Sequence, residues 1–262
     1  MPELPEVETI VRMLAPRLAG RSIVRIEIRS PRVLAGAPAQ LARVHGCLIE
    51  SVARCGKYLL LRLDRGVVTI HLGMTGSLRW QGKPGPHTRA VIVLDAGRLH
   101  FDDPRQFGRI AAGELPPQRL AELGPEAPSI TTAELARRLA GRRAPIKALL
   151  MDQRIVAGLG NIYSQEALFR ARIHPLTPGG RLSRERVKRL VRAIRQVLSE
   201  AIAAGGSSVS DYVNADGEPG RFQFAHRVYQ RSGEPCLRCG TPIRRILLAQ
   251  RGTHFCPRCQ RL

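Results

Sequence analysis

Residues 58–72, YLLLRLDRGVVTIHL, decide the fold of the first half of the chain, because two short apolar runs flank a charged turn that ends at Gly66. Short apolar runs bounded by charged or glycine turns are typical of β-strands that face a core. Further runs of this kind recur at regular intervals, at residues 22–28, 47–54, 77–80, 89–94 and 98–101. This spacing predicts a β-sandwich or a β-barrel.

A helix precedes these strands at residues 5–19. Its apolar side chains at positions 7, 10, 11, 14 and 18 recur at the spacing of one helix face. Pro5 occupies the first turn, where its missing N–H costs nothing, and Gly20 is placed to end the helix. The apolar period becomes helical again beyond about residue 131, over residues 132–140, 145–152, 161–170 and 183–204.

The change of period divides the chain into domains. Pro116-Pro117 and residues 124–129 mark the boundary between strands and helices, and residues 209–226 form a loop without clear periodicity. The pattern predicts an α+β fold with domains at residues 1–129, 130–230 and 231–262.

The last domain contains the most specific motif, two Cys-x2-Cys pairs separated by 16 residues. Four thiolates at this spacing bind Zn²⁺ tetrahedrally, and a segment of about 30 residues has too small a core to fold without such a crosslink. Disulfide bonds are the alternative, but we expect a reducing compartment. The motif therefore predicts one structural Zn²⁺ held by Cys236, Cys239, Cys256 and Cys259, with Cys47 and Cys55 as ordinary buried thiols.

Between the two cysteine pairs, residues 243–249 and 253–255 predict two strands joined through Gln250-Arg251-Gly252. An arginine at a hairpin tip is suited to enter a DNA groove or to bind a phosphate. An ordinary surface arginine is an equally good interpretation of these residues alone.

The net charge of +21, from 42 Lys and Arg against 21 Asp and Glu, is typical of proteins that bind nucleic acid. Residues 134–262 carry +15 of this charge, and we expect them to form the main phosphate-binding surface. A coding bias toward arginine is the alternative, since only four lysines occur, but it does not explain the shortage of acids.

The chain contains no stretch of about 18 apolar residues that could cross a membrane. Its start, MPELPEVE, is acidic and contains proline, unlike a secretion signal. We therefore expect a cytoplasmic protein that does not act at a membrane.

The start of the chain also suggests covalent chemistry. Removal of Met1 would leave Pro2 as a secondary amine, which can attack a sugar C1′ and form an iminium, as a Schiff-base lysine does. Reference pKa values of α-amino groups lie near about 8, so part of such an amine is neutral at physiological pH. Glu3 and Glu6 are close enough in sequence to assist by acid–base catalysis. An acidic, well-capped helix start is the alternative for these residues alone.

One lysine and two glycine-rich turns complete the candidate site. Lys57 opens an apolar strand in a chain that otherwise uses arginine, which hints at a need for a compact ammonium group. The turns 71–76 and 103–108 follow strands and contain Met74, Arg105 and Phe107. Apolar wedges beside an arginine can open a base step and replace an expelled base, although taken alone such residues are more often part of a core.

Taken together, these residues resemble the formamidopyrimidine-DNA glycosylase/endonuclease VIII family over essentially the whole chain. The opening PELPEVET, residues 71–77, 103–108 and 157–163, and the four final cysteines occur in the order and spacing of that family. The resemblance implies an N-terminal helix on a β-sandwich, a helix–two-turn–helix domain and a C-terminal zinc-finger hairpin. It also implies a monomeric DNA glycosylase and AP lyase that acts on damaged double-stranded DNA and cuts the strand by β,δ-elimination.

The resemblance implies a role for each matching position. Pro2 is expected to be the nucleophile, Glu3 the general acid–base group and Glu6 a supporting acid. Lys57 is expected to contact phosphate and assist strand cleavage, and residues 209–226 match the lesion-recognition loop. The remaining positions are expected to bind DNA: Met74, Arg105 and Phe107 in the gap left by the flipped lesion, with Arg105 facing the orphaned base, and His71, Asn161 and Arg251 on phosphates.

Within the family, Leu4, the spread of the gap-filling residues over two loops and the long loop at 209–226 favour the formamidopyrimidine branch. That branch removes oxidised purines such as 8-oxoguanine. Gln106 departs from it, because a second arginine is frequent at this position. Two alternatives stay open: an endonuclease VIII-type enzyme for oxidised pyrimidines, and a DNA- or ribosome-binding zinc protein without activity.

Overall fold

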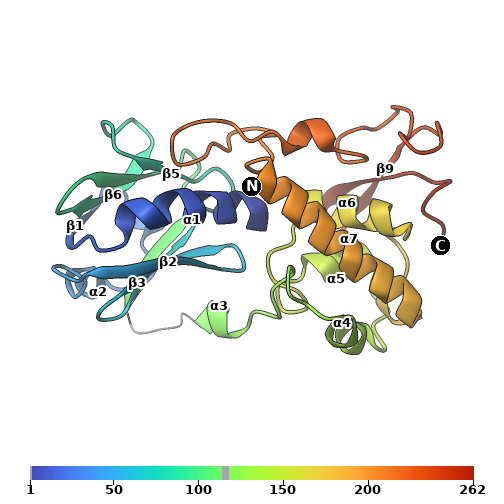
Figure 1. The fold of residues 1–262 in the computed structure, drawn as a ribbon, viewed down its shortest axis with the longest axis horizontal. Coiled ribbons are helices and arrows are strands. Elements are labelled where there is room, and N and C mark those ends of the chain that lie inside the picture. Colours follow the sequence, from blue (N-terminus) through green and yellow to red (C-terminus); the bar gives the residue numbers. More distant parts are fainter. Residues whose placement is uncertain (1, 114–117) are drawn as a thin grey trace. The chain divides into compact units, whose positions relative to one another are not determined.

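The computed structural model describes residues 2–113 and 118–262 (Figure 1). The chain forms two compact units, one of Met1–Ala121 with Ile202–Gln223 and one of Glu122–Ala201 with Phe224–Leu262. The predicted loss of Met1 and the predicted boundary at Pro116-Pro117 fall outside the described residues.

The first unit contains two four-stranded antiparallel sheets, with the strand orders β1-β6-β7-β5 and β2-β3-β4-β8. One hydrophobic core contains residues of both sheets, such as Ile92 and Leu61. The α+β prediction is confirmed, and the two separate sheets make the first unit a sandwich instead of a barrel. The strands are β1 Ile23–Ile28, β2 Ile49–Cys55, β3 Tyr58–Leu63, β4 Val67–His71, β5 Ser77–Trp80, β6 Thr88–Leu94, β7 Arg98–Asp102 and β8 Arg109–Gly113.

Helix α1, Leu4–Leu18, packs its predicted apolar face into this core. Val7, Ile10 and Leu14 are fully buried, and burial of each such side chain contributes about 2 kcal/mol to folding. Pro5 lies in the first turn, and Gly20 follows the helix with a φ of 79°, a conformation that favours glycine.

Strand β8 was not predicted from the sequence. Its residues, RIAAG, include one large apolar side chain, Ile110, so the segment has no clear alternation. The strand forms because β4 offers it a free edge, where Ile110 pairs with Ile70. The short helices α2, Pro38–Ala42, and α3, Gln118–Ala121, were also not predicted.

The second unit contains most of the helices that the sequence predicts, each within a residue or two of its expected bounds. These are α4 Thr132–Leu139, α5 Ile146–Met151, α6 Asn161–Ala171 and α7 Arg184–Ala203. The Gly158–Gly160 turn before α6 is held by Gln153, which accepts from the Gly158 N–H at 2.9 Å and donates to the Leu159 carbonyl at 2.8 Å.

The zinc-finger hairpin consists of β9, Arg244–Leu248, and β10, Arg251–Phe255. Arg251 was predicted in the connection, but it is the first residue of β10 and pairs with Leu248. Ala249 and Gln250 form the turn, with φ values of 48° and 58°. Positive φ at both positions is typical of the type I′ turn, whose twist matches that of the two strands. The turn therefore begins one residue earlier than expected.

Residues 202–223 belong to the first unit, although the sequence places them in the second domain. Their contacts explain this. Tyr212 and Ala215 lie in the sandwich core, and the Ala215 carbonyl accepts from the Trp80 N–H at 2.9 Å. The start of the predicted lesion loop is therefore built onto the sandwich.

None of the helices in the described ranges combines the length and the apolar character needed to cross a membrane.

Candidate functional site

The site in the first unit begins with Pro2 and Glu3, which lie directly before helix α1. Both residues are buried, and so is Glu6 in the first helical turn. The Glu6 carboxylate accepts from the Glu3 N–H at 2.7 Å. This bond holds the extended segment that contains Pro2 and Glu3 against the N-terminal end of the helix, where the partial positive charge of the helix dipole is located.

Glu6 also connects this segment to a distant part of the chain. Its second carboxylate oxygen accepts from the Ser207 N–H at 2.8 Å, and the Tyr212 hydroxyl donates to the Glu6 carbonyl at 3.3 Å. A Cβ at Gly206 would lie 2.9 Å from the same carboxylate oxygen, so the close approach requires glycine. Burial raises the pKa of Tyr212, and the negative charge of Glu6 adds to this effect. The structure thus places the base of the 209–226 loop beside Glu3.

The loop itself is closed by its own hydrogen bonds. The Ser208 hydroxyl accepts from the Gly220 N–H at 2.8 Å, and the Ser208 N–H donates to Gln223 at 3.0 Å. The Phe222 N–H donates to the Gly206 carbonyl at 2.9 Å. Residues 220–223 therefore lie against residues 206–208, which contact Glu6 through Ser207.

Lys57 lies in the turn between β2 and β3 and is buried to 8 % exposure. Arg54 positions this turn, because it forms an ion pair with Glu8 of α1 at 2.9 Å and donates to the Gly56 carbonyl at 2.9 Å. Helix α1 and the Lys57 turn are thus tied together by one partly buried guanidinium group.

Met74, Arg105 and Phe107 come together because Asp103 joins their two loops. The fully buried Asp103 carboxylate accepts from the Thr75 hydroxyl at 2.6 Å and from the Gly108 N–H at 2.7 Å. Arg105 is exposed and its guanidinium lies 5.0 Å from the Phe107 ring centre, while Phe107 is 49 % exposed and Met74 half-buried. Phe107 is therefore not a core residue, so the alternative interpretation of this side chain as part of a core is wrong.

Gln106 lies between these two residues with a φ of 57° and accepts from the Ser30 hydroxyl at 2.6 Å. In this conformation the side chain is used to hold the loop. His71 lies at the end of β4, and the centre of its imidazole ring is 4.8 Å from the centre of the Tyr58 ring. Its Nδ1 accepts from the Gly73 N–H at 3.1 Å, so in the neutral ring the proton is on Nε2.

Asn161 and Arg251, in the second unit, are joined by a hydrogen-bond network between α6 and β10. Gln165 donates to the Asn161 carbonyl at 2.7 Å and to the Gly252 carbonyl at 3.1 Å, and it accepts from the His254 N–H at 2.7 Å. Asn161 itself donates to the Gly252 carbonyl at 3.3 Å. The helix start and the strand that begins at Arg251 are therefore fixed to each other.

A fully buried ammonium completes this network, because Lys147 donates to the Asn161 Oδ1 at 2.6 Å. Sequence reasoning missed Lys147 and Gln165. The rarity of lysine in this chain was the available signal for Lys147, whereas Gln165 had none, since a polar residue in a helix is ordinarily exposed.

The four predicted zinc ligands converge, and their sulfur atoms all lie within 4.8 Å of one another. The pairs Cys236–Cys259 and Cys239–Cys256 are 4.0 Å and 3.5 Å apart. These distances are far longer than a disulfide bond and match the roughly 3.8 Å between sulfurs that a tetrahedral ion with bonds of about 2.3 Å requires. N–H groups of Arg238 and Cys259 donate to Cys236 and Cys256 at 3.4 Å, as thiolate acceptors need. The residues fit one structural Zn²⁺, as predicted.

The thiols have unequal pKa values before a metal binds. Hydrogen bonds from Thr241 and neighbouring thiols lower the pKa of Cys239 to about 6, whereas burial and the nearby sulfurs raise the pKa of Cys259 to about 12. Zn²⁺ would bind all four as thiolates, so metal binding at neutral pH releases protons from the thiols that are still protonated, such as Cys259. The other two cysteines do not join the cluster. Cys47 is a buried thiol of the sandwich core, as predicted, whereas Cys55 is partly exposed and the prediction that it is buried was wrong.

Comparison with known families matches three consecutive parts of the chain. Residues 1–110 match the formamidopyrimidine-DNA glycosylase N-terminal domain, and residues 123–213 match the H2TH domain of the same enzymes. Residues 233–262 match the zinc finger found in FPG and IleRS.

Similar proteins match over their full length. The formamidopyrimidine-DNA glycosylase of Solibacter usitatus is 53% identical over 264 residues, covering 100% of both chains. The crystal structure of the MutM (Fpg) protein from Thermus thermophilus superimposes with a TM-score of 0.91 at 46% identity, covering 99% of this chain and 98% of that one. A Lactococcus lactis FPG mutant in complex with Fapy-dG-containing DNA has a TM-score of 0.91 at 34% identity, with both chains fully covered.

Proposed function

Because this chain belongs to the formamidopyrimidine-DNA glycosylase family, we propose that it removes oxidised purines from duplex DNA through Pro2 and then cuts the strand at the same site. The chain is a DNA glycosylase of base-excision repair. We propose in addition that the reaction passes through a covalent intermediate, that the enzyme cuts the strand and that its substrates are oxidised purines.

The observation that carries the proposal is the placement of Pro2 and Glu3 before helix α1, with Glu6 holding both the segment and the base of the 209–226 loop. Once Met1 is removed, the Pro2 nitrogen is a secondary amine at the positive end of a 15-residue helix, which favours its neutral, nucleophilic form. Buried carboxylates beside it supply acid–base groups.

The chemistry follows from these groups. The Pro2 nitrogen forms a bond to C1′ as the bond from C1′ to the base breaks, and the base leaves with a proton. Glu3 protonates the sugar ring oxygen as the ring opens, and loss of the amine proton leaves an iminium. The iminium acidifies the C2′ proton, and loss of this proton expels the 3′ phosphate by β-elimination. The product is conjugated, so loss of the C4′ proton then expels the 5′ phosphate by δ-elimination. We assign to Lys57 the contact with a phosphate in these steps, because its ammonium is a compact point charge.

The two loops joined by Asp103 supply the residues that replace the flipped nucleotide. Met74 and Phe107 provide apolar surface, and the exposed Arg105 guanidinium is available to hydrogen-bond the orphaned base. Asn161, Arg251 and His71 are the proposed phosphate contacts. The Zn²⁺ is structural, since it has four protein ligands and no open position.

We propose that the protein acts as a cytoplasmic monomer on double-stranded DNA. Similar solved structures are complexes of Lactococcus lactis Fpg with abasic-site DNA and with Fapy-dG DNA, which supports DNA as the partner here.

Borohydride trapping on defined duplexes tests the proposal. The protein is incubated with duplexes that contain 8-oxoguanine, a formamidopyrimidine, thymine glycol or no lesion, and the reduced covalent adduct is quantified. We expect adducts with the purine lesions and strand products that carry phosphate at both ends. A preference for thymine glycol would identify an endonuclease VIII-type specificity, and the absence of any adduct would refute the catalytic assignment.

A further inference from the structure

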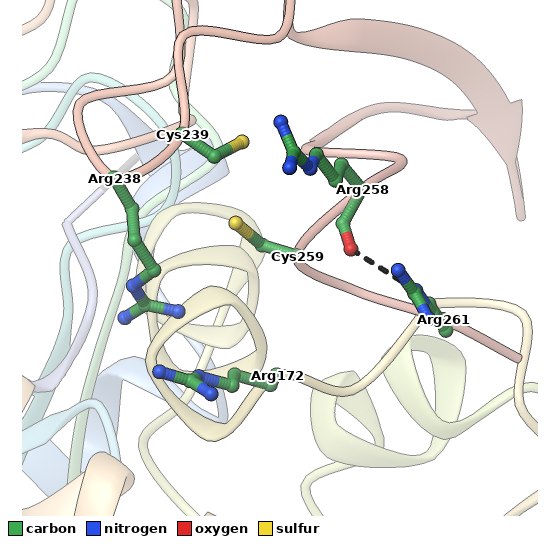
Figure 2. A pocket seen from close by; sticks show the side chains of 6 residues that line it. All are labelled: Arg172, Arg238, Cys239, Arg258, Cys259 and Arg261. Carbon is green, nitrogen blue, oxygen red and sulfur yellow. Dashed lines mark hydrogen bonds between the residues drawn. The ribbon is translucent and has the colours of Figure 1, made fainter.

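The second unit contains a cavity of about 560 Å³ beside the cysteine cluster. Its lining consists of Arg172, Arg238, Cys239, Arg258, Cys259 and Arg261, and Figure 2 shows these side chains arranged around the two sulfur atoms. The volume is in the range of about 300–1,000 Å³ that is typical of small-molecule sites. No carboxylate contributes to the lining.

The four guanidinium groups have no ion pair among the described residues. Nearby arginines differ: Arg170 pairs with Glu200 at 2.6 Å. Two of the four are nevertheless held in place. Arg238 stacks 4.6 Å from the Phe169 ring centre, and Arg261 Nε donates to the Arg258 carbonyl at 3.4 Å.

Zinc does not account for all of this positive charge. Four thiolates around Zn²⁺ carry a formal charge of −2, and the C-terminal end of a helix such as α6 adds about half a negative charge. The charge of +4 on the four guanidinium groups is larger than this negative charge. A surplus of fixed positive charge in a concave site, with planar donors that match phosphate oxygens, favours binding of an anion.

We propose that this cavity is a second phosphate-binding site, separate from the phosphate contacts at Asn161 and Arg251. Arg172 follows the last residue of α6, whereas Asn161 is its first residue. With 11 residues in the helix, the two positions are about 16 Å apart, so one phosphate cannot occupy both sites. The ligand is a phosphate group, either free or in a DNA backbone.

The test compares two double variants with the same change in net charge. Arg172→Asn with Arg258→Gln removes two guanidinium groups of the cavity, and asparagine tolerates the positive φ of 57° at residue 172. Arg137→Gln with Arg143→Gln removes two exposed arginines elsewhere in the unit. Both proteins are prepared with zinc, and binding of inorganic phosphate is followed by ³¹P NMR.

We expect the cavity variant to bind inorganic phosphate at least about tenfold more weakly than the control, with one zinc per chain in both. Equal phosphate binding in the two variants would overturn the proposal. Loss of zinc from the cavity variant alone would also overturn it, because the arginines would then serve only to balance the thiolates.

Affinity for undamaged duplex DNA distinguishes the sources of the phosphate. A loss of affinity confined to the cavity variant, with a shallower salt dependence, assigns the site to the DNA backbone. Unchanged DNA affinity with weakened phosphate binding assigns it to a free phosphate compound. Neither result depends on Pro2 chemistry, so failure here and failure of the catalytic proposal are separable.

Discussion

At the scale of single residues, the site depends on buried groups that have specific hydrogen-bond partners. Glu6 is an example, since its two carboxylate oxygens accept from the N–H groups of Glu3 and Ser207, which are 204 positions apart along the chain. A buried N–H that loses its acceptor costs about 1–3 kcal/mol. The proposed role of Glu6 as a supporting acid is therefore combined with a structural one.

Replacing Pro2 with Gly is expected to weaken base release and borohydride trapping by at least about a hundredfold, because a secondary amine is replaced by a primary one in a flexible residue. The measurement is single-turnover release of 8-oxoguanine and the yield of trapped adduct. An N-terminal extension that blocks the amine serves as the second variant. Trapping at full strength in the extended protein would make Lys57 the first alternative nucleophile.

His226 is expected to make stability depend on pH. Burial lowers its pKa to about 4, so between pH 6.5 and about 4 the unfolded state binds a proton that the folded state does not. Stability from this group is complete above pH 6.5 and falls by up to about 3 kcal/mol as the pH drops to 4.

The measurement is the free energy of unfolding at pH 7 and pH 5 for the parent protein and His226→Gln. The variant should lose less stability over this interval. Glu166 has the opposite effect on the pH dependence of stability. Burial raises its pKa, although three backbone N–H donors partly lower it again. Glu166 is present in both proteins, so its effect is the same in each. An identical pH dependence in the two proteins would contradict the assignment to His226.

At the scale of elements, helix α6 and strand β10 form one block through Gln165. Gln165→Leu preserves the size of the side chain but removes its bonds to Gly252 and His254. We expect DNA affinity to fall about tenfold with zinc retained, because the start of β10 at Arg251 is then held to α6 less firmly, with the bond from Asn161 to the Gly252 carbonyl remaining. Gln196→Leu, an exposed site on α7, is the control. Equal affinities in the two variants would show that the hairpin is positioned by other contacts.

The zinc module is expected to depend on the metal for folding. Cys256→Ser removes a buried ligand, so the hairpin should unfold and DNA binding should weaken, while the sandwich of the first unit stays folded. Elemental analysis measures the zinc content, limited proteolysis the hairpin, near-UV circular dichroism the sandwich, and a DNA titration the binding. Well-folded parent protein without zinc would refute the metal site.

At the scale of the whole molecule, the charge of +21 predicts that DNA affinity falls steeply with salt, because each neutralised phosphate releases counterions. Arg251→Ala should flatten the log–log salt slope by about one unit and weaken lesion and abasic duplexes alike. Arg105→Ala should leave the slope nearly unchanged and relax discrimination between C and A opposite the lesion. The opposite pattern would mean that the roles of these two arginines are exchanged.

Local sequence was sufficient for the elements with strong patterns. The apolar runs at 58–63 and 67–71 form β3 and β4, the helical spacing from Val7 to Leu18 forms α1, and the Cys-x2-Cys pairs bring four sulfurs together. For the strands and the helix the signal lies within a few residues, because the period of the backbone sets which side chains share a face. The two cysteine pairs are 16 residues apart, and the preference of Zn²⁺ for four thiolates is what links them. The weakly patterned β8 was missed, because it forms only when β4 provides a partner.

By itself the sequence therefore determined the α+β class, the zinc ligands, the family and, through the family, the residues expected to act on DNA. Only the tertiary structure decided which distant groups are joined. It attached residues 202–223 to the sandwich through Glu6 and Ser207, buried Lys147 against Asn161, and used Gln106 to bind Ser30. The physical reason is that a polar side chain has many possible partners in an extended chain. Burial selects one of them, since only a satisfied hydrogen bond offsets the loss of water.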